Sequence, residues 1–96
     1  MMVYHGSPIK NFESIKKNGL VPDKYDKKIY FGANEKQAIA AAPGGVLFRV
    51  KKSNISKLNQ LDVPSSGNRI FDTNNIIRPK FLEYSKDNGK TWFGTI

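Results

Sequence analysis

The chain has 96 residues and a formal net charge of +8, from 16 Lys and Arg against 8 Asp and Glu. This length predicts a single domain over residues 1–96, and the absence of cysteine excludes disulfides and thiolate metal sites. A single histidine argues against a histidine-based metal site, and no apolar run approaches the roughly 20 residues of a membrane span. We therefore expect a cytoplasmic protein with no metal and no membrane contact. Its positive charge either keeps it in solution or attracts an anionic partner such as nucleic acid, a nucleotide or an acidic protein.

The first third of the chain predicts a strand, a helix and a second strand. Residues 2–5 are mostly apolar and aromatic, as in a short strand. Phe12 and Ile15 fall on one side of a helix over residues 10–20, with charged residues on the other side. Residues 28–33 combine β-branched and aromatic side chains, which predicts a second strand.

A second helix and a third strand follow. Asn34 with Gln37 three residues later is a capping-box pattern, and the alanines behind it favour helix over residues 34–42. Pro43 and two glycines end this helix, and residues 46–50 then read as a strand with an alternating apolar face.

The second half of the chain predicts further strands and one hairpin. Residues 51–68 carry little pattern, whereas residues 69–71 and 76–85 read as strand segments. A hairpin is expected over residues 86–96, with Asn88-Gly89 as its turn. Strands dominate and the two short helices lie in the N-terminal half, so we predict the α+β class.

One motif lies at the start of this hairpin. Residues 85–92, SKDNGKTW, fit the pattern S-x-D-x-G-x-T-W. The pattern resembles the Asp-box, a hairpin turn of sialidase-type propellers, which carry several copies on much longer chains. We interpret the single copy as a turn in which a side chain bonds its own backbone, and we assign it no chemistry.

Two short segments hold the candidate binding residues. A lone histidine at the end of a strand, such as His5, is more often structural than functional, but its neighbours favour a ligand. Gly6 lacks a Cβ, so a flat ligand can approach its backbone, and Ser7 adds a hydroxyl beside it. Tyr30 alternates with Phe31 along its strand, so one ring faces the core. Tyr30 is either a core residue whose hydroxyl is hydrogen-bonded, or a stacking platform for a planar ring.

The order and spacing of several segments resemble a known family. YHGSPIKNFESIKKNGL at residues 4–20 and KKIYFGANEKQA at residues 27–38 resemble the catalytic domain of poly- and mono-ADP-ribosyltransferases of the diphtheria-toxin-like, H-Y-E branch. NNIIRPKFLEYS at residues 74–85 is similar to the family segment of the form Q-[IV]-x-P-[KE]-[FY]-L. The resemblance implies a minimal ADP-ribosyltransferase-like fold, with a split antiparallel sheet and two short helices.

The resemblance also implies roles for individual residues, with NAD as co-substrate. The motif histidine, here His5, would bond the adenosine-side ribose. The backbone of Gly6 would hold the nicotinamide carboxamide, and Ser7 would face the ribose. Tyr30 would line the nicotinamide pocket. His5 and Tyr30 would thereby belong to the catalytic machinery.

The chain departs from the family pattern at two places. The family's glutamate, which stabilises a cation-like ribose, should fall near residues 67–69, where no acid is present. Asn68 can still bond a ribose hydroxyl, and Glu83, ranked ahead of Asp72, is the candidate substitute acid. The helix after the motif tyrosine also lacks the family's serine and second tyrosine, and Gln37 would replace the serine.

These observations predict NAD-dependent mono-ADP-ribosyl transfer to a protein or nucleic-acid acceptor, with release of nicotinamide. The alternative is a catalytically weak or inactive module that binds NAD or ADP-ribose, or that acts as an inhibitor. An RNA 2′-phosphotransferase-like enzyme fits less well, because that branch has histidine in place of Tyr30 and needs a set of arginines.

Overall fold

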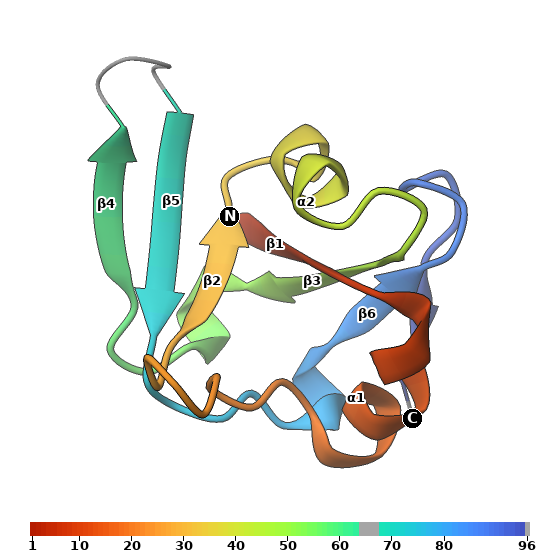
Figure 1. Cartoon of the computed structure of the whole chain (residues 1–96), viewed down its shortest axis with the longest axis horizontal. Helices are drawn as coiled ribbons and strands as arrows, with labels where there is room; N and C mark the ends of the chain where they lie inside the picture. The colour runs from red at the N-terminus through yellow and green to blue at the C-terminus, as the bar shows by residue number, and fades with distance from the viewer. Residues whose placement is uncertain (64–67, 96) are drawn as a thin grey trace.

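The computed structural model describes residues 1–63 and 68–95, apart from the side chains of residues 62, 63 and 68. Seven strands form one antiparallel sheet in the order β4-β5-β2-β1-β3-β6-β7, accompanied by two α-helices (Figure 1), which confirms the α+β class. The elements in chain order are β1 (Met2–Ser7), η1 (Ile9–Asn11), α1 (Phe12–Asn18), β2 (Ile29–Gly32), α2 (Glu35–Ala41), β3 (Val46–Lys51), η2 (Lys52–Asn54), β4 (Asn59–Val63), β5 (Asn68–Thr73), η3 (Pro79–Phe81), β6 (Glu83–Ser85) and β7 (Phe93–Gly94), where η marks a 3₁₀ turn.

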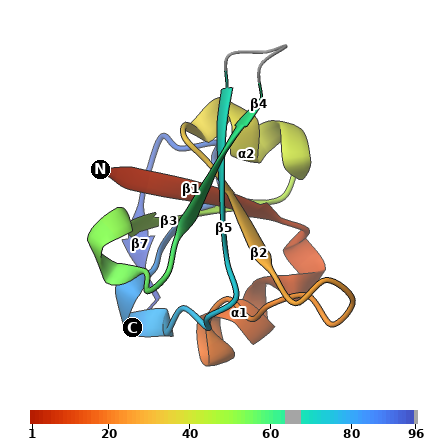
Figure 2. The same ribbon diagram turned by 90° about the vertical axis from the view of Figure 1, so that its left-hand side faces the viewer.

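The sheet consists of two halves that meet at one point. β1 pairs with β3 along its whole length, from Met2–Lys51 to Ser7–Val46. Its pairing with β2 on the other side is confined to Tyr4 and Gly32. Beyond that pair the two strands diverge, and β2 continues with β5. Figure 2 shows β1 and β3 running across the direction of β2, β4 and β5. The sheet is thus divided between β1 and β2, although its ladder is continuous.

The helices cover the two faces of the β1–β3 half. α1 places Phe12 and Ile15 in the core, where the Phe12 ring lies 6.4 Å from the Phe48 ring. α2 packs closely on β1, because the backbone of Gly6 lies directly beneath the carbonyl of Ala38. β3 therefore lies between both layers and is the most completely buried strand.

The start of α2 forms as its sequence predicts, with one difference. The Asn34 side chain accepts a hydrogen bond from the backbone N–H of Gln37 at 2.9 Å, and Glu35 occupies the first turn. Gln37 does not complete the reciprocal half of the capping box, since its side-chain oxygen accepts from Ala33 N–H at 2.8 Å.

Three expectations about the second half need correction. β4 (Asn59–Val63) lies in the stretch that carried little pattern, because NQLDV is a polar edge strand. Residues 76–85 do not form a continuous strand, since Pro79 begins the η3 turn and only Glu83–Ser85 joins the sheet. The expected hairpin does form, since β6 pairs with β7, but Asn88-Gly89 is part of a longer connecting loop over residues 86–92 and not a two-residue turn.

The helices are short throughout the part of the chain that the structure describes. α1 and α2 have seven residues each. No helix within residues 1–63 and 68–95 is long and apolar enough to cross a membrane.

Candidate functional site

A cleft opens on one face of the sheet where β1 and β2 diverge. We call it the histidine cleft. One wall is His5–Ser7, and the other wall contains Asp23, Asp26 and residues 28–30. Its volume is about 420 Å³, within the range of small-molecule sites. A second hollow of about 460 Å³, also lined by His5, Gly6 and Tyr30, lies against α2. The divergence of two strands therefore brings the predicted residues His5, Gly6, Ser7 and Tyr30 together.

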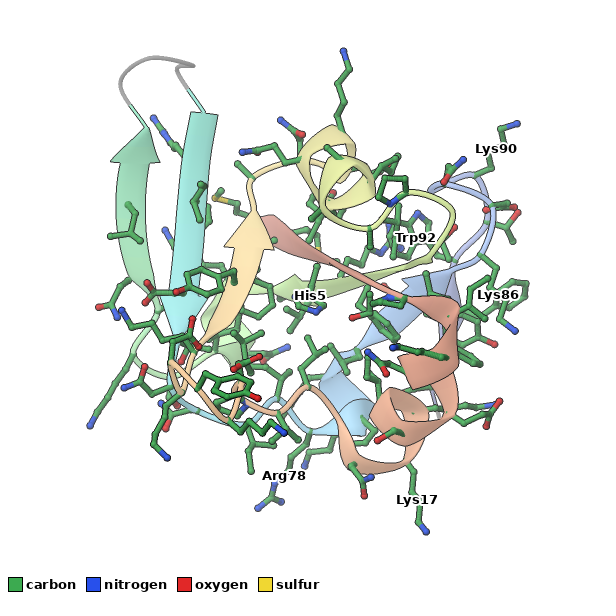
Figure 3. All side chains as sticks on the ribbon, viewed as in Figure 1. His5, Lys17, Arg78, Lys86, Lys90 and Trp92 are labelled. Carbon is green, nitrogen blue, oxygen red and sulfur yellow. The ribbon has the colours of Figure 1, made fainter. Side chains whose placement is uncertain are left out.

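His5 links the two halves of the sheet through its side chain. Its Nδ1 lies 2.7 Å from the backbone oxygen of Tyr30. A carbonyl oxygen only accepts, so Nδ1 carries the proton, and in the neutral ring Nε2 is an acceptor. The ring also meets the Phe31 ring edge-on, at 5.9 Å between centroids. Burial lowers the pKa of His5 below its ordinary 6.5, and the hydrogen bond to Tyr30 opposes this shift. His5 is therefore a neutral ring of fixed orientation near pH 7. Figure 3 labels its place in the structure.

Gly6 has a structural reason to be glycine that the sequence did not reveal. A Cβ at this position would lie 2.1 Å from the carbonyl oxygen of Ala38 in α2. The missing Cβ therefore admits the helix, and close approach of a ligand is not needed to explain the residue. The backbone of Gly6 still lines the histidine cleft, as does Ser7, which is buried to 4% exposure.

Tyr30 has its ring open to solvent and its hydroxyl anchored. The residue is 44% exposed, while its neighbours Ile29 and Phe31 are buried. Its hydroxyl donates to Oδ2 of Asp26 at 2.9 Å. This bond raises the pKa of Tyr30 above its ordinary 10, with smaller effects from burial and from nearby acids. Tyr30 is thus the exposed ring of the alternating pair, and Phe31 is the core ring.

Asp23 and Asp26 are cleft residues that were absent from the sequence-based candidates. The loop before β2 is folded by its own side chains: Asp23 Oδ1 accepts from Tyr25 N–H at 2.7 Å, and Asp26 Oδ1 accepts from Lys28 N–H at 3.1 Å. Lys27 adopts a left-handed conformation with φ of 60°. The carboxylate of Asp26 is therefore held at two points. Its position four residues before Tyr30 was the only hint available in the sequence.

The side chain of Gln37 is held by two hydrogen bonds within the protein. Its Oε1 accepts from Ala33 N–H at 2.8 Å, and its Nε2 donates to the backbone oxygen of Arg69 at 3.1 Å. Both ends of the amide are thus engaged by the protein. Gln37 thereby joins the start of α2 to β5, and it also lines the second hollow together with His5, Gly6 and Tyr30.

Glu83 lines a different cleft, and Asp72 is buried beside the histidine cleft, where Lys28 Nζ lies 3.9 Å from its Oδ2. Glu83 faces Arg49 on the neighbouring strand and accepts from its Nε at 2.9 Å, beside a different cleft. Asp72 is opposite Tyr30 in the β2–β5 ladder but is only 1% exposed, and its carboxylate accepts from Asn59 Nδ2 at 2.9 Å. The expectation that Glu83 supplies the missing charge is therefore wrong in geometry. The side chain of Asn68 lies outside the described residues.

The Asp-box pattern builds a self-contained loop, as expected. Ser85 Oγ accepts from Gly89 N–H at 2.9 Å, and Asp87 Oδ1 accepts from Thr91 N–H at 2.8 Å. Hydrogen bonds from Ser85 and Thr91 lower the pKa of Asp87 to about 2. Trp92 closes the loop by donating from Nε1 to the Gly89 oxygen at 3.0 Å.

Comparison of the chain with protein-family models, with curated proteins and with solved structures finds no match. The described residues also bring no three His, Cys, Asp or Glu side chains together in a group suited to a metal ion. The function proposed below therefore rests on the histidine cleft and its side chains.

Proposed function

We propose that the histidine cleft binds NAD as co-substrate, and that the protein is a mono-ADP-ribosyltransferase acting on a protein or nucleic-acid acceptor. One observation carries the proposal. His5 and Tyr30 lie 25 residues apart in sequence, yet they meet across the only point where the sheet divides, joined by the 2.7 Å bond from Nδ1 to the Tyr30 oxygen. The sequence resemblance to the ADP-ribosyltransferases gave these same two residues binding roles.

The side chains of the cleft have chemistry that suits a nicotinamide dinucleotide. The acceptor nitrogen Nε2 of His5 suits a ribose hydroxyl, which can donate to it. The exposed ring of Tyr30 offers a flat surface to a planar nicotinamide, and its bond to Asp26 limits its rotation. The backbone of Gly6 on the opposite wall can bond an amide.

Asp26 is the acid that we propose for stabilising the transition state. NAD supplies a bond between nicotinamide and ribose, whose cleavage leaves positive charge on the ribose. A fixed carboxylate near that charge lowers the barrier, and loss of one such electrostatic partner typically costs about 10²–10³ in rate. Asp26 lines the histidine cleft and is held by Tyr30 and by Lys28 N–H, whereas Glu83 lies elsewhere.

The test is release of nicotinamide from NAD by the purified protein and by single variants. His5→Ala and Tyr30→Phe separate the roles of the two walls: the first should abolish measurable NAD binding, and the second should loosen Asp26 while the stacking ring stays. Asp26→Asn should lower turnover by about 10²-fold with little change in binding. Glu83→Gln is the matched control, since it neutralises one acid outside the cleft and should leave turnover unchanged.

Two results would contradict the proposal. Wild-type protein that neither binds nor consumes NAD at millimolar concentration removes the function. Turnover that survives Asp26→Asn but is lost in Glu83→Gln removes Asp26 as the acid and leaves the NAD site in place.

A binding module is the second candidate, and one observation favours it. Both acids of the cleft, Asp23 and Asp26, lie on a loop, and Asp26 already accepts the Tyr30 hydroxyl. NAD or ADP-ribose that binds tightly without nicotinamide release in any variant would support it. A 2′-phosphotransferase is disfavoured because none of Arg49, Arg69 and Arg78 lines the described part of the histidine cleft.

A further inference from the structure

Another cleft, separate from the histidine cleft and from the hollow against α2, lies at the other end of β1 and β3. It runs between η2 and η3, with a volume of about 570 Å³. We call it the basic cleft, lined by Arg49, Lys51, Asn54, Lys80, Phe81 and Glu83, among others. It shares no lining residue with the histidine cleft. In Figures 1 and 2 the short turns that border it lie on the side of the molecule remote from α2.

The charges in the basic cleft are mostly unbalanced. Among the described side chains that line it, Glu83 is the one carboxylate, and Arg49 Nε donates to this group at 2.9 Å. Neither Lys51 nor Lys80 forms an ion pair with any carboxylate among the described side chains. These described side chains therefore give the cleft an excess of two positive charges, on a chain whose net charge is already +8. Such a field attracts a polyanion.

Flat side chains accompany these cations. Phe81 lines the cleft and is 36% exposed, with Lys80 Nζ 5.0 Å from its ring centroid. The Arg49 guanidinium lies 4.2 Å from the Trp92 ring centroid, which fixes it in place above the sheet. Cations that alternate with an exposed aromatic ring are the combination that holds single-stranded nucleic acid, because phosphates meet the cations and a base stacks on the ring.

We propose that the basic cleft binds single-stranded nucleic acid. Lys51, Lys80 and Arg49 contact successive phosphates, and Phe81 stacks on one base. An acidic peptide would use the lysines equally well but would gain nothing specific from a flat ring, so the exposed Phe81 favours nucleic acid. This binding is independent of NAD and of the reaction in the histidine cleft.

The experiment measures binding of a fluorescein-labelled 12-nucleotide single-stranded RNA by anisotropy, over a range of salt concentrations. Each phosphate contact contributes about 0.7 to the slope of log K against log salt for single strands. Glu83 already balances Arg49, so the two lysines predict a slope near −1.4. The double variant Lys51→Gln, Lys80→Gln should therefore lower the magnitude of the slope by about 1.4. Phe81→Leu keeps an apolar side chain without a π face, and it should weaken binding by at least about 5-fold.

Two controls make the result specific. Lys36→Gln, Lys90→Gln removes the same charge from α2 and from the loop over residues 86–92, outside the basic cleft, and should change binding far less. His5→Ala should leave RNA binding unchanged, which separates this site from the NAD site. Thermal denaturation checks that each variant is folded.

Three results would overturn the proposal. The first is no RNA binding by the wild type at 50 mM salt. The second is an equal loss in the Lys36, Lys90 control, which means general charge attraction only. The third is a labelled oligoglutamate peptide that binds the basic cleft more tightly than the RNA, which would assign the cleft to an acidic protein partner.

Discussion

Replacement of Gly6 by alanine tests whether this residue is glycine for the helix above it. The added Cβ would lie 2.1 Å from the Ala38 oxygen, and real Cβ contacts essentially never fall below 3.0 Å. The two atoms must therefore separate by about 0.9 Å. The backbone of residue 6 fixes the Cβ and the oxygen is itself backbone, so no side-chain rotation relieves the clash. Overpacking of this kind costs about 1–3 kcal/mol, which lowers Tm by roughly 4–8 °C per kcal/mol for a domain of this size.

The assay is urea denaturation without any ligand, together with amide chemical shifts. Gly6→Ala should lower the midpoint and shift the amides of α2 (Glu35–Ala41). Gly44→Ala is the control, because a Cβ there meets nothing within 4 Å and only its φ of 74° is strained. Its shifts should stay within the turn after α2. A Gly6→Ala protein that keeps wild-type stability and unshifted α2 amides would refute the packing argument. Residue 6 would then be glycine because a ligand approaches its backbone.

Three further predictions concern hydrogen bonds and pH. Gln37→Ala removes two bonds, one from Ala33 N–H and one to Arg69 O, and should lower the free energy of unfolding by about 1–3 kcal/mol in urea. The depressed pKa of Asp87 means that the folded state holds its charge longer than the unfolded state. Stability present above pH 3.8 should therefore fall as pH drops toward about 2, and Asp87→Asn should lack this component in acid denaturation. The lowered pKa of His5 means that the unfolded chain takes up a proton first, so wild-type Tm should fall as pH drops below about 6.5, and His5→Gln should flatten that decline.

Local sequence patterns predicted the elements that are stabilised by hydrogen bonds between residues close together in the sequence. α2 follows from Asn34 and the alanines, and the loop over residues 85–92 follows from side chains that bond backbone two to four residues away. β4 could not be predicted, because NQLDV gains its strand conformation from pairing with β5. The strand expected over residues 76–85 failed at Pro79, whose ring favours a turn.

The predictions for the site show the same difference between local patterns and contacts with distant residues. His5 and Tyr30 were found by motif, and their meeting depends on the strand order. The bond from Gln37 to Arg69 could not be predicted, because the two residues lie 32 positions apart in sequence. A regular strand holds a side chain firmly, which favoured Glu83 as the substitute acid. The neighbouring strand also determines what Glu83 contacts, and here that residue is Arg49. Asp26 could not be predicted, because the direction of a carboxylate on a loop depends on how the loop folds.

The division of the sheet also has a consequence for the order in which a ribosome makes the protein. Both walls of the histidine cleft are built from the first thirty residues of the chain, but each wall is stabilised by a strand made much later. β1 needs β3 at Val46–Lys51, and β2 needs β5, whose pairing runs from Ile70 to Thr73. Such distant pairings form slowly and leave strand edges open in the meantime. A nascent chain that ends before about residue 70 therefore carries His5 and Tyr30 without a site, and the cleft forms only after β5 has been made.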